Sequence, residues 1–557
     1  MSMRNENAEQ VLQANHDVVI VGAGFAGMYM LHRLRSLGLK VRVFERGTDV
    51  GGTWYWNRYP GARCDVESMQ YSYSFSEELQ QEWKWTERYA AQPEILAYAR
   101  HVADRFNLRP DIQFETSVVS MSFDEECNRW TVTLDSGQDI TAGFVVMATG
   151  SLSNARTPDL IGLSSFEGKT YHTGQWPHDG VDFSGLRVGV IGTGSSAIQA
   201  IPIIAGEARH LTVFQRTPNF SIPAHNHSLS DEKAKDWKVN YSELRRRARE
   251  ESRNGLVFDF PTKSALEDTE ADRSKHYEAR WAIGGTIFTA SYNDLAINKA
   301  SNDTAAEFVR SKIREIVKDP DVAKLLQPTT YPIGTKRICV DTNYYETFNR
   351  DNVTLVDIRN APIERITPRG LITGGKEYEF DAIVFATGFD AMTGSFAKVD
   401  IRGREGMTLK QKWAEGPKTY LGLMVAGFPN LFFVTGPGSP SVLSNMVVSI
   451  EQHVDWIADC LVQLSQRGVE SIEATERSES DWVAHVNEVA SKTLYPEANS
   501  WYMGANVPGK PRVFMPYIGG VNMYRLKCRE VANRGYEGFE LRTIAGTSQS
   551  RRAVKKG

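Results

Sequence analysis

Two strand–turn–helix segments with a glycine fingerprint constrain the fold of this chain more than any other feature of its sequence. In the first, the β-branched run 17–21 leads directly into Gly22-Ala-Gly24-Phe-Ala-Gly27, and apolar residues at helical spacing continue to Gly38. The glycines permit a tight turn, a close approach of backbone to a pyrophosphate, and close packing of helix against strand. Free N–H groups at the start of the helix favour a phosphate there. This order predicts the first unit of a dinucleotide-binding Rossmann fold.

The end of the next strand indicates which dinucleotide the first site takes. The run 41–45 is predicted as that strand, and Glu45 lies 23 residues after Gly22. A carboxylate there accepts hydrogen bonds from both ribose hydroxyls of an adenosine that has no 2′-phosphate. The first site is therefore predicted to bind FAD or NAD rather than NADP. A structural turn followed by a surface glutamate is the alternative interpretation.

The same pattern recurs once, with a chemical change. The predicted strand 187–191 leads into the turn 192–197, Gly-Thr-Gly-Ser-Ser-Ala, where alanine takes the place of the third glycine. The position equivalent to Glu45 is Gln215, and Arg216 follows it. Without the acid nothing repels a 2′-phosphate, and a guanidinium can hold that phosphate through two hydrogen bonds. The second site is predicted to prefer NADPH, although an arginine after a strand can also be an ordinary surface residue.

Two further buried runs indicate how the chain is divided. The runs 144–150 and 383–388 both end in Ala-Thr-Gly and are predicted as strands that return to a doubly wound sheet near a cofactor. The predicted fold is α/β, with two discontinuous Rossmann-like domains and a helical insertion whose charge runs are interpreted as solvated faces. The predicted divisions are 1–152 and 389–557 for the FAD-binding domain, 153–222 and 332–388 for the NADP-binding domain, and 223–331 for the insertion.

Composition argues against several other classes of protein. The 557 residues contain 64 Lys and Arg against 68 Asp and Glu, too balanced for a main partner that is nucleic acid. The basic cluster at 551–556 is predicted to be a frayed end. Five widely separated cysteines disfavour a disulfide framework or a metal site, and no signal peptide or membrane segment is expected. These patterns predict a cytoplasmic protein, monomeric or weakly homo-oligomeric, with no membrane partner.

Beyond the nucleotide motifs, the chain resembles the type I Baeyer–Villiger monooxygenases, NADPH-dependent flavoproteins that convert ketones into esters or lactones with O₂. The family fingerprint FxGxxxHxxxW is matched by Phe166, Gly168, His172 and Trp176, between the two glycine motifs. A second family pattern is matched by the run 51–65, Gly-Gly-Thr-Trp-Tyr-Trp-Asn-Arg-Tyr-Pro-Gly-Ala-Arg-Cys-Asp. The resemblance extends over nearly the whole chain and is closest to the phenylacetone, steroid and cyclic-ketone branch.

This resemblance implies a reaction and roles for three residues. NADPH reduces FAD, O₂ adds to give a C4a-peroxide, and the peroxide attacks a ketone to form a tetrahedral adduct that rearranges to the ester. Arg337 is implied to be the fixed cation that stabilises the peroxide and the adduct. Asp65 is implied to pair with Arg337 and position it, and Lys336 to help hold the NADP 2′-phosphate. Sulfoxidation is expected as a side activity.

The resemblance also implies a wider set of site residues. His172 could shuttle protons near neutral pH, but its place in the fingerprint favours a structural or hinge role. Trp54, Trp56 and Trp176 could equally be core aromatics, and only Trp54 is expected near the flavin. The expected substrate pocket comprises Leu443, Ser444 and Met446. The expected cofactor-binding residues are Gly22, Gly24, Phe25, Gly27, Glu45, Thr53, Trp54, Asp65, Tyr71, Val118, Gly192, Thr193, Gly194, Ser195, Ser196, Arg216, Thr217, Lys336 and Trp501.

Several other functions stay open at this stage. A flavoprotein disulfide reductase would need a redox cysteine pair, which Cys64 lacks in the sequence. An N-hydroxylating or sulfur-oxidising flavin monooxygenase shares the two-nucleotide plan without needing the pair of Asp65 and Arg337. A non-catalytic NADPH sensor and an NADPH oxidase that releases only peroxide are further alternatives. The ketone itself is also open, because binding discriminates weakly between apolar groups of similar size.

Overall fold

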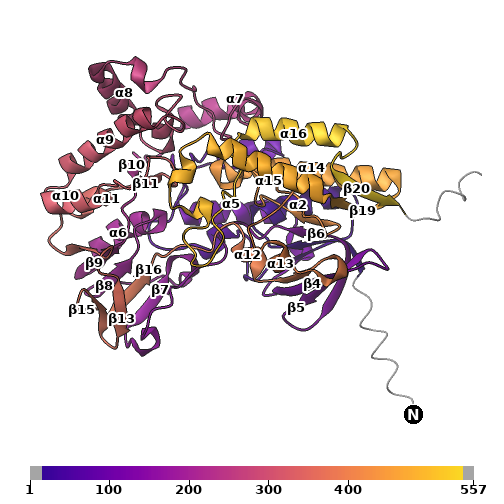
Figure 1. Ribbon diagram of the computed structural model, residues 1–557, viewed down its shortest axis with the longest axis horizontal. Coiled ribbons are helices and arrows are strands. Elements are labelled where there is room, and N and C mark those ends of the chain that lie inside the picture. Colours follow the sequence, from indigo (N-terminus) through magenta and orange to yellow (C-terminus); the bar gives the residue numbers. More distant parts are fainter. Residues whose placement is uncertain (1–14, 544–557) are drawn as a thin grey trace, which may run out of the picture.

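Two sheets organise the molecule, one in each half (Figure 1). The computed structural model describes residues 15–543, so the basic cluster at 551–556 lies outside the described part of the chain. The first sheet has the order β17-β4-β5-β6-β1-β2-β3, with β18 beside β6. Its strands are β1 (Asn15–Val21), β2 (Val41–Phe44), β3 (Ile112–Gln113), β4 (Val118–Asp124), β5 (Arg129–Leu134), β6 (Asp139–Met147), β17 (Asp400–Arg402) and β18 (Leu431–Phe433).

The second sheet is entirely parallel and has the order β12-β9-β8-β16-β7. Its central strand is β8, the strand that precedes the second glycine turn. The strand β9 lies on one side of β8, and β16, which leads into Ala-Thr-Gly, lies on the other. Its strands are β7 (Lys169–His172), β8 (Arg187–Ile191), β9 (His210–Gln215), β12 (Val353–Asp357) and β16 (Ala382–Phe385).

The two halves share one plan. In each, a glycine turn joins an inner strand, β1 or β8, to a helix, α2 (Phe25–Ser36) or α6 (Ser195–Glu207), and a parallel second strand follows. Three consecutive antiparallel strands come later in each half: β4-β5-β6 in the first, and β13 (Ile363–Thr367), β14 (Gly370–Thr373) and β15 (Lys376–Glu379) in the second. The predicted α/β class is confirmed, and the repeat is longer than the predicted β–α–β unit. The domain boundaries remain a prediction.

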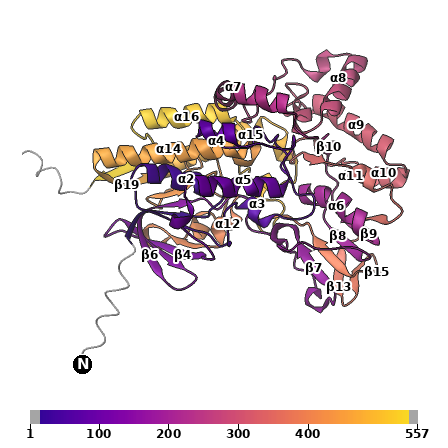
Figure 2. The ribbon, with the colours of Figure 1, turned by 180° about the vertical axis from the view of Figure 1, so that it is seen from behind.

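Long helices cover one face of the first sheet. The helix α14 (Met446–Arg467) packs on α2, and apolar residues of both helices, among them Leu34 and Val454, share one core. The helices α5 (Gln92–Arg105), α15 (Glu476–Ser491) and α16 (Val521–Asn533) lie on the same side (Figures 1 and 2). None of the helices between residues 15 and 543 is long and apolar enough to cross a lipid bilayer.

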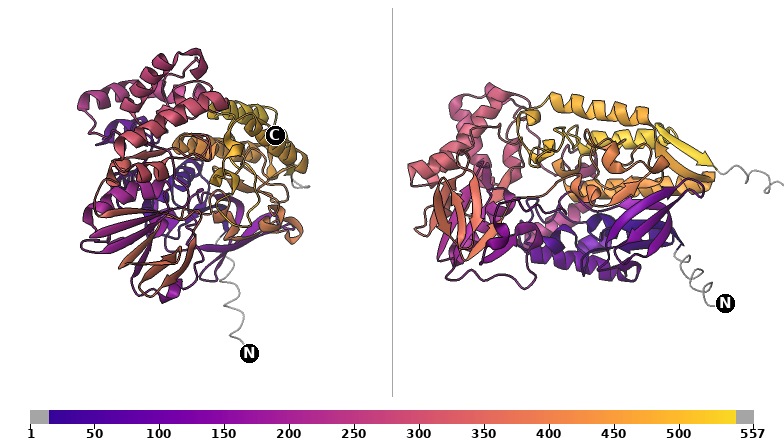
Figure 3. Two further views of the ribbon diagram at one scale, coloured as in Figure 1. Left: turned by 60° about the vertical axis from the view of Figure 1, so that its left-hand side comes forward. Right: turned by 60° about the horizontal axis from the view of Figure 1, so that its bottom comes forward.

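The helical segment after β10 (Ser221–Pro223) contacts both halves of the molecule. Its members are α7 (Asp231–Glu250), α8 (Glu270–Ile283), α9 (Lys299–Ile316) and α10 (Pro320–Leu326). The last three pack into the core of the second half, where Tyr277 and Ile313 are buried. Figure 3 shows these helices grouped at the end of the molecule that holds the second sheet. In contrast, Tyr241 of α7 is buried in the core of the first half. An amphipathic pattern shows that a helix has an apolar face but not which part of the molecule that face contacts. The contact of α7 with the first half could therefore not be predicted from the sequence.

Arg245 secures this contact of α7 with the first half. Its guanidinium is buried and donates hydrogen bonds to the backbone oxygens of Gln70 (2.9 Å) and Met69 (3.2 Å) and to the hydroxyl of Ser72 (2.6 Å). Buried carbonyl groups that lose their donors are costly. The helix α7 is therefore held to the first half by a polar anchor as well as by apolar packing.

We expect Arg245→Ala to lower the free energy of unfolding by about 2–4 kcal/mol, because three buried acceptors lose their donor. Urea denaturation followed by circular dichroism measures this change. Arg246→Ala is the matched control, because Arg246 is exposed and pairs with Glu243 and Glu251 on the surface, so we expect no measurable change. Equal destabilisation by the two variants would contradict the anchoring role.

Candidate active site

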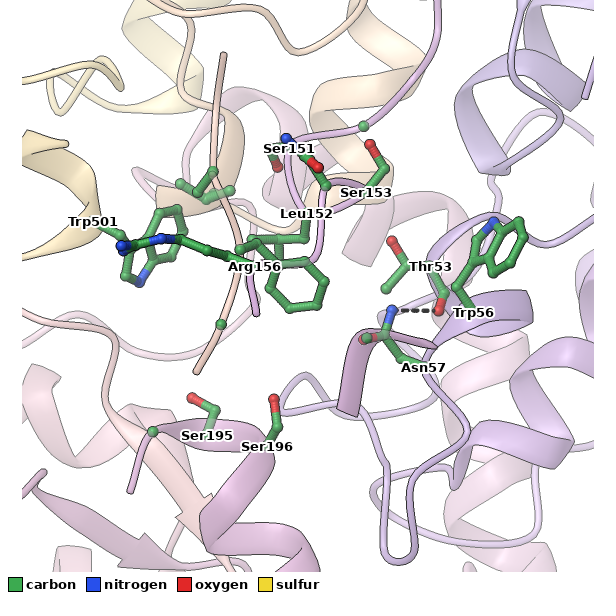
Figure 4. A pocket seen from close by; sticks show the side chains of 18 of the residues that line it. Thr53, Trp56, Asn57, Ser151, Leu152, Ser153, Arg156, Ser195, Ser196 and Trp501 are labelled. Atoms are coloured by element: carbon green, nitrogen blue, oxygen red, sulfur yellow. Dashed lines mark hydrogen bonds between the residues drawn. The ribbon is translucent and has the colours of Figure 1, made fainter. Parts of the chain in front are cut away.

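One cavity of about 1060 Å³ lies where the two halves meet. Both glycine turns line it, together with the Ala-Thr-Gly ends of β6 and β16. In Figure 4, Thr53 and Asn57 of the first half and Ser195 and Ser196 of the second lie around the same space. The carboxyl ends of parallel strands are the usual ligand-binding edge of doubly wound sheets, and here two such edges share one cavity.

The first turn needs its glycines for steric reasons. Gly22 has a φ of +102°, and a Cβ there would lie 2.8 Å from the carbonyl oxygen of Ala148. A Cβ at Gly27 would overlap the carbonyl oxygen of Gly22, so helix and strand pack at backbone distance. A Cβ at Gly24 would lie 3.4 Å from the Cα of Gly52. No side chain caps the N-terminus of α2, which leaves its N–H groups for a ligand.

Glu45 lies on the cavity wall directly after β2. Its carboxylate is buried and accepts hydrogen bonds from the backbone N–H groups of Ala23 (2.8 Å) and Gly47 (2.7 Å). These bonds fix the carboxylate against the turn. An ionised carboxylate has about four acceptor positions, so two remain for the ribose hydroxyls of an adenosine.

The second turn leaves open space where a pyrophosphate would approach. Gly192 has a φ of +112°, and a Cβ there would overlap the carbonyl oxygen of Ala386. A Cβ at Gly194 would meet nothing within 4 Å. The same is true of Gly150 and Gly388, which end the Ala-Thr-Gly segments with positive φ. Both halves therefore provide room for a dinucleotide beside backbone that only glycine allows.

Two cations meet at the far end of β9. The strand β10 (Ser221–Pro223) follows Arg216 and pairs in parallel with β11 (Cys339–Asp341), which follows Lys336. Burial and the nearby charge of Arg216 lower the pKa of Lys336 to about 8. No ion pair joins either cation to a carboxylate among the described residues. Gln215 points elsewhere and donates to the carbonyl oxygen of Leu325 (2.8 Å), so no acid opposes a bound 2′-phosphate.

Arg337 and Asp65 form a bidentate ion pair on the cavity wall. Nε of Arg337 lies 2.8 Å from one carboxylate oxygen of Asp65, and Nη2 lies 2.6 Å from the other. The remaining Nη1 donates to the carbonyl oxygen of Val442 (3.0 Å). Burial alone lowers the pKa of Arg337, but the charge and hydrogen bonds of Asp65 raise it above its ordinary value. The guanidinium is thus a permanent cation of fixed orientation on the cavity wall.

The cavity brings most of the predicted site residues together. Those that line it are Gly22, Gly24, Phe25, Glu45, Thr53, Trp54, Asp65, Tyr71, Val118, Gly192, Thr193, Gly194, Ser195, Ser196, Arg216, Thr217, Lys336, Arg337, Ser444, Met446 and Trp501. Gly27 is not among them, since it serves the packing of α2. Leu443 is also absent from the wall, and its neighbour Val442 takes that place. Trp56, which the sequence did not place near the flavin, lines the cavity, and the Arg46 guanidinium lies over its ring, 4.4 Å from the ring centre.

The fingerprint residues lie behind the cavity wall. His172 ends β7, and its Nδ1 accepts from the backbone N–H of Gly174 (2.9 Å), so Nε2 carries the proton and donates to the carbonyl oxygen of Arg156 (3.1 Å). Burial lowers the pKa of His172, which keeps the imidazole neutral. A Cβ at Gly168 would lie 2.5 Å from the Phe166 ring. Trp176 is buried in the core. These contacts tie the sheet edge to the connections between the halves.

Charged residues that the sequence did not single out also line the cavity. Its wall carries eight Lys and Arg side chains, and Glu45 and Asp65 are its only carboxylates within the described chain. Arg46, Arg156 and Lys398 belong to this set but lie outside any motif. The excess of positive charge fits the phosphates of two dinucleotides. Among residues 15–543 no cluster of His, Cys, Asp and Glu could hold a metal ion.

The cysteines do not form a redox pair in the described part of the chain. Cys64 and Cys339 line the cavity as free thiols. Burial raises the pKa of the Cys339 thiol to about 12 and also raises the pKa of Cys64. A disulfide reductase needs a reactive thiolate, so the geometry disfavours this alternative.

Comparisons with known proteins agree with this architecture. A family model described as pyridine nucleotide-disulphide oxidoreductase matches residues 19–234, the part that holds both glycine turns. A Baeyer-Villiger monooxygenase from Pseudooceanicola batsensis is 42% identical over 96% of this chain and 98% of its own length. A phenazine N-monooxygenase from Lysobacter antibioticus is 43% identical over 95% of this chain and 97% of its own. The solved structure of an oxidized steroid monooxygenase bound to NADP is 56% identical, with a TM-score of 0.90 over 95% of this chain and 99% of that one.

These likenesses run over almost the full length of each relative, so they include both sheets, the helical segment and the cavity. The family fingerprint, the two glycine turns and the bidentate pair of Asp65 with Arg337 occur together in one molecule. The chain belongs to the Baeyer–Villiger monooxygenase family of flavoproteins.

Proposed function

We propose that this protein is an NADPH- and O₂-dependent FAD monooxygenase that converts ketones into esters or lactones. The observation that carries the proposal is the position of the Arg337 guanidinium. It is a permanent cation, oriented by Asp65, on the wall of a cavity that both dinucleotide turns line. Free thiols support a cytoplasmic setting. Sulfoxidation would be a side activity of the same site.

The two ends of the cavity would hold different dinucleotides. The turn at Gly22 and the carboxylate of Glu45 would hold FAD, whereas the turn at Gly192 with Arg216 and Lys336 would hold NADPH. Bound FAD would accept a hydride from NADPH and activate O₂ for transfer of one oxygen atom. The chain's own residues bring these groups to one enclosed space.

Arg337 supplies the electrostatic part of the reaction. Insertion of oxygen into a ketone develops negative charge on oxygen, and a preorganised cation on a cavity wall stabilises such charge strongly. Asp65 and the carbonyl of Val442 hold three of its nitrogen atoms, so the guanidinium does not need to reorient. Val442 and Met446 supply apolar surface to the wall of the same cavity.

Oxygenation of nitrogen or sulfur is a second candidate. The relative named as a phenazine N-monooxygenase is as similar to this chain as the Baeyer-Villiger relative is. The apolar wall near Met446 would also accept an aromatic heterocycle. A nucleophilic nitrogen or sulfur atom would attack activated oxygen directly, and no tetrahedral oxyanion would form on a carbonyl carbon. The two candidates therefore differ in how much they need Arg337.

Product analysis tests the proposed function. We expect purified protein with FAD, NADPH and O₂ to convert at least one ketone of an aryl, linear, cyclic and steroid panel into an ester or lactone. Mass spectrometry identifies the product, and the amount of ester should match the NADPH consumed. A panel of aromatic amines, heterocycles and thioethers is run in parallel. Oxidation of NADPH with release of peroxide alone would contradict the ketone-oxygenating function.

We expect Arg337→Ala to lower the rate of ester formation by about 10²-fold or more, because the developing oxyanion loses its cation. Reduction of the flavin by NADPH should persist and is followed by absorbance under anaerobic conditions. Arg187→Ala is the control, since Arg187 makes a similar double contact with Asp381 away from the cavity, and it should keep ester formation. Normal ester yield in Arg337→Ala would remove this residue from its proposed role.

The lowered pKa of Lys336 predicts how NADPH affinity depends on pH. Below about pH 8 the free protein carries a protonated Lys336, and above it the amine is neutral. A bound 2′-phosphate favours the protonated form, so the Kd for NADPH should rise by up to about tenfold per pH unit above pH 8. Fluorescence titration measures this between pH 7 and 9.5. NADH lacks the phosphate and should show little change, and Lys336→Met should remove the dependence. The same pH dependence for NADH would contradict the contact.

A further inference from the structure

A cation that the proposed reaction does not use faces the cavity from the connection after β6. Arg156 lines the cavity and is half-buried, yet no carboxylate of the described chain pairs with it. In Figure 4 its side chain extends alongside Trp501, with Ser195 and Ser196 of the second glycine turn across the space from it. A partly buried guanidinium without a counter-ion favours a ligand that supplies negative charge.

Three hydrogen bonds to the second half hold the backbone of Arg156 in place. Its N–H donates to the carbonyl oxygen of Gly388 (3.0 Å), and its own carbonyl oxygen accepts from Thr387 Oγ1 (2.5 Å) and from His172 Nε2 (3.1 Å). His172 belongs to the family fingerprint and is buried. The fingerprint histidine thus positions Arg156 at the cavity.

The side chain of Arg156 has donors to spare. A guanidinium carries five N–H groups, and the one protein acceptor within the described chain is the carbonyl oxygen of Asn506, which takes a hydrogen bond from Nη1. Asn506 in turn donates to the carbonyl oxygen of Phe389 (2.7 Å). The segment that contains Trp501 and Asn506 therefore orients the guanidinium and leaves its other N–H groups available to a ligand.

We propose that Arg156 binds the pyrophosphate of the nicotinamide dinucleotide from the side opposite the Gly192–Ser196 turn. The proposal rests on the proposed binding of NADPH at this turn. The N-terminus of α6 provides N–H donors on one side of a pyrophosphate, and the open space at Gly194 gives the pyrophosphate room to approach them. Arg216 and Lys336 are taken by the 2′-phosphate at the end of β9. Arg156 completes the set with a planar fork that suits two phosphate oxygens.

The alternative is that Arg156 only ties the segment 499–511 to the connections between the halves. Lys510 makes a tie of this second kind, because its Nζ contacts Asp390 (2.6 Å) and the carbonyl oxygen of Ala391 (2.8 Å). Lys510 does not line the cavity. Substitution of Lys510 therefore removes a structural contact of this segment but leaves the charge of the cavity wall unchanged.

The pyrophosphate is common to NADP⁺ and NAD⁺, and this property separates Arg156 from Arg216. We expect Arg156→Ala to raise the Kd for NADP⁺ and for NAD⁺ by the same factor, about tenfold or more, as the FAD-loaded protein is titrated by calorimetry. Arg216→Ala should weaken NADP⁺ far more than NAD⁺. Arg156→Lys should recover part of the affinity, because the charge stays but the fork is lost. Lys510→Gln should leave both affinities within twofold.

Each other outcome has a distinct meaning. Unchanged Kd values in Arg156→Ala would overturn the proposal, and so would a loss confined to NADP⁺ or an equal loss in Lys510→Gln. Wild-type protein that binds neither dinucleotide would instead overturn the proposed function. Flavin absorbance and the melting temperature show whether each variant is folded, and Arg156→Lys provides the comparison if Arg156→Ala is not.

Discussion

The ion pair between Asp65 and Arg337 is the constraint on which the rest of the structure depends. Its partners lie 272 residues apart in sequence, one in the glycine-rich run after β2 and the other after the helical segment. Two half-buried charges lose much of their hydration, and only good geometry offsets that loss. Here both carboxylate oxygens are used and a carbonyl oxygen takes a further guanidinium N–H. The pair therefore requires the two halves of the molecule to meet in one arrangement.

The duplicated fold makes this meeting possible. Each half ends its parallel strands at an edge that suits a dinucleotide, and the edges face one cavity. The pairing of β10 with β11 brings Lys336 to Arg216 and leaves the next residue, Arg337, at the cavity. The helix α7 and its anchor Arg245 hold the helical segment to the first half. Positioning thus depends on rigid elements, and the side chains that face the cavity need little adjustment.

The features that could be predicted from the sequence are those that depend on the spacing of nearby residues. Strand, glycine turn and helix follow one another within a few residues, so both Rossmann units and the contrast between Glu45 and Gln215 could be predicted. Prediction was weaker where tertiary packing decides. Val442 rather than Leu443 lines the cavity, a difference of one position in a loop. The side on which α7 packs depends on which part of the molecule contacts its apolar face. Arg156 belongs to no periodic pattern, so only the structure reveals that it faces the cavity.

The central claim is that a single cavity couples oxidation of NADPH to insertion of one oxygen atom from O₂ into a ketone. Isotope labelling tests it most directly. The protein is incubated with NADPH, a ketone and ¹⁸O₂, and the product is analysed by mass spectrometry. The account predicts an ester that carries one ¹⁸O atom, formed in proportion to the NADPH oxidised. An ester without the label, or label recovered only in hydrogen peroxide, would contradict it.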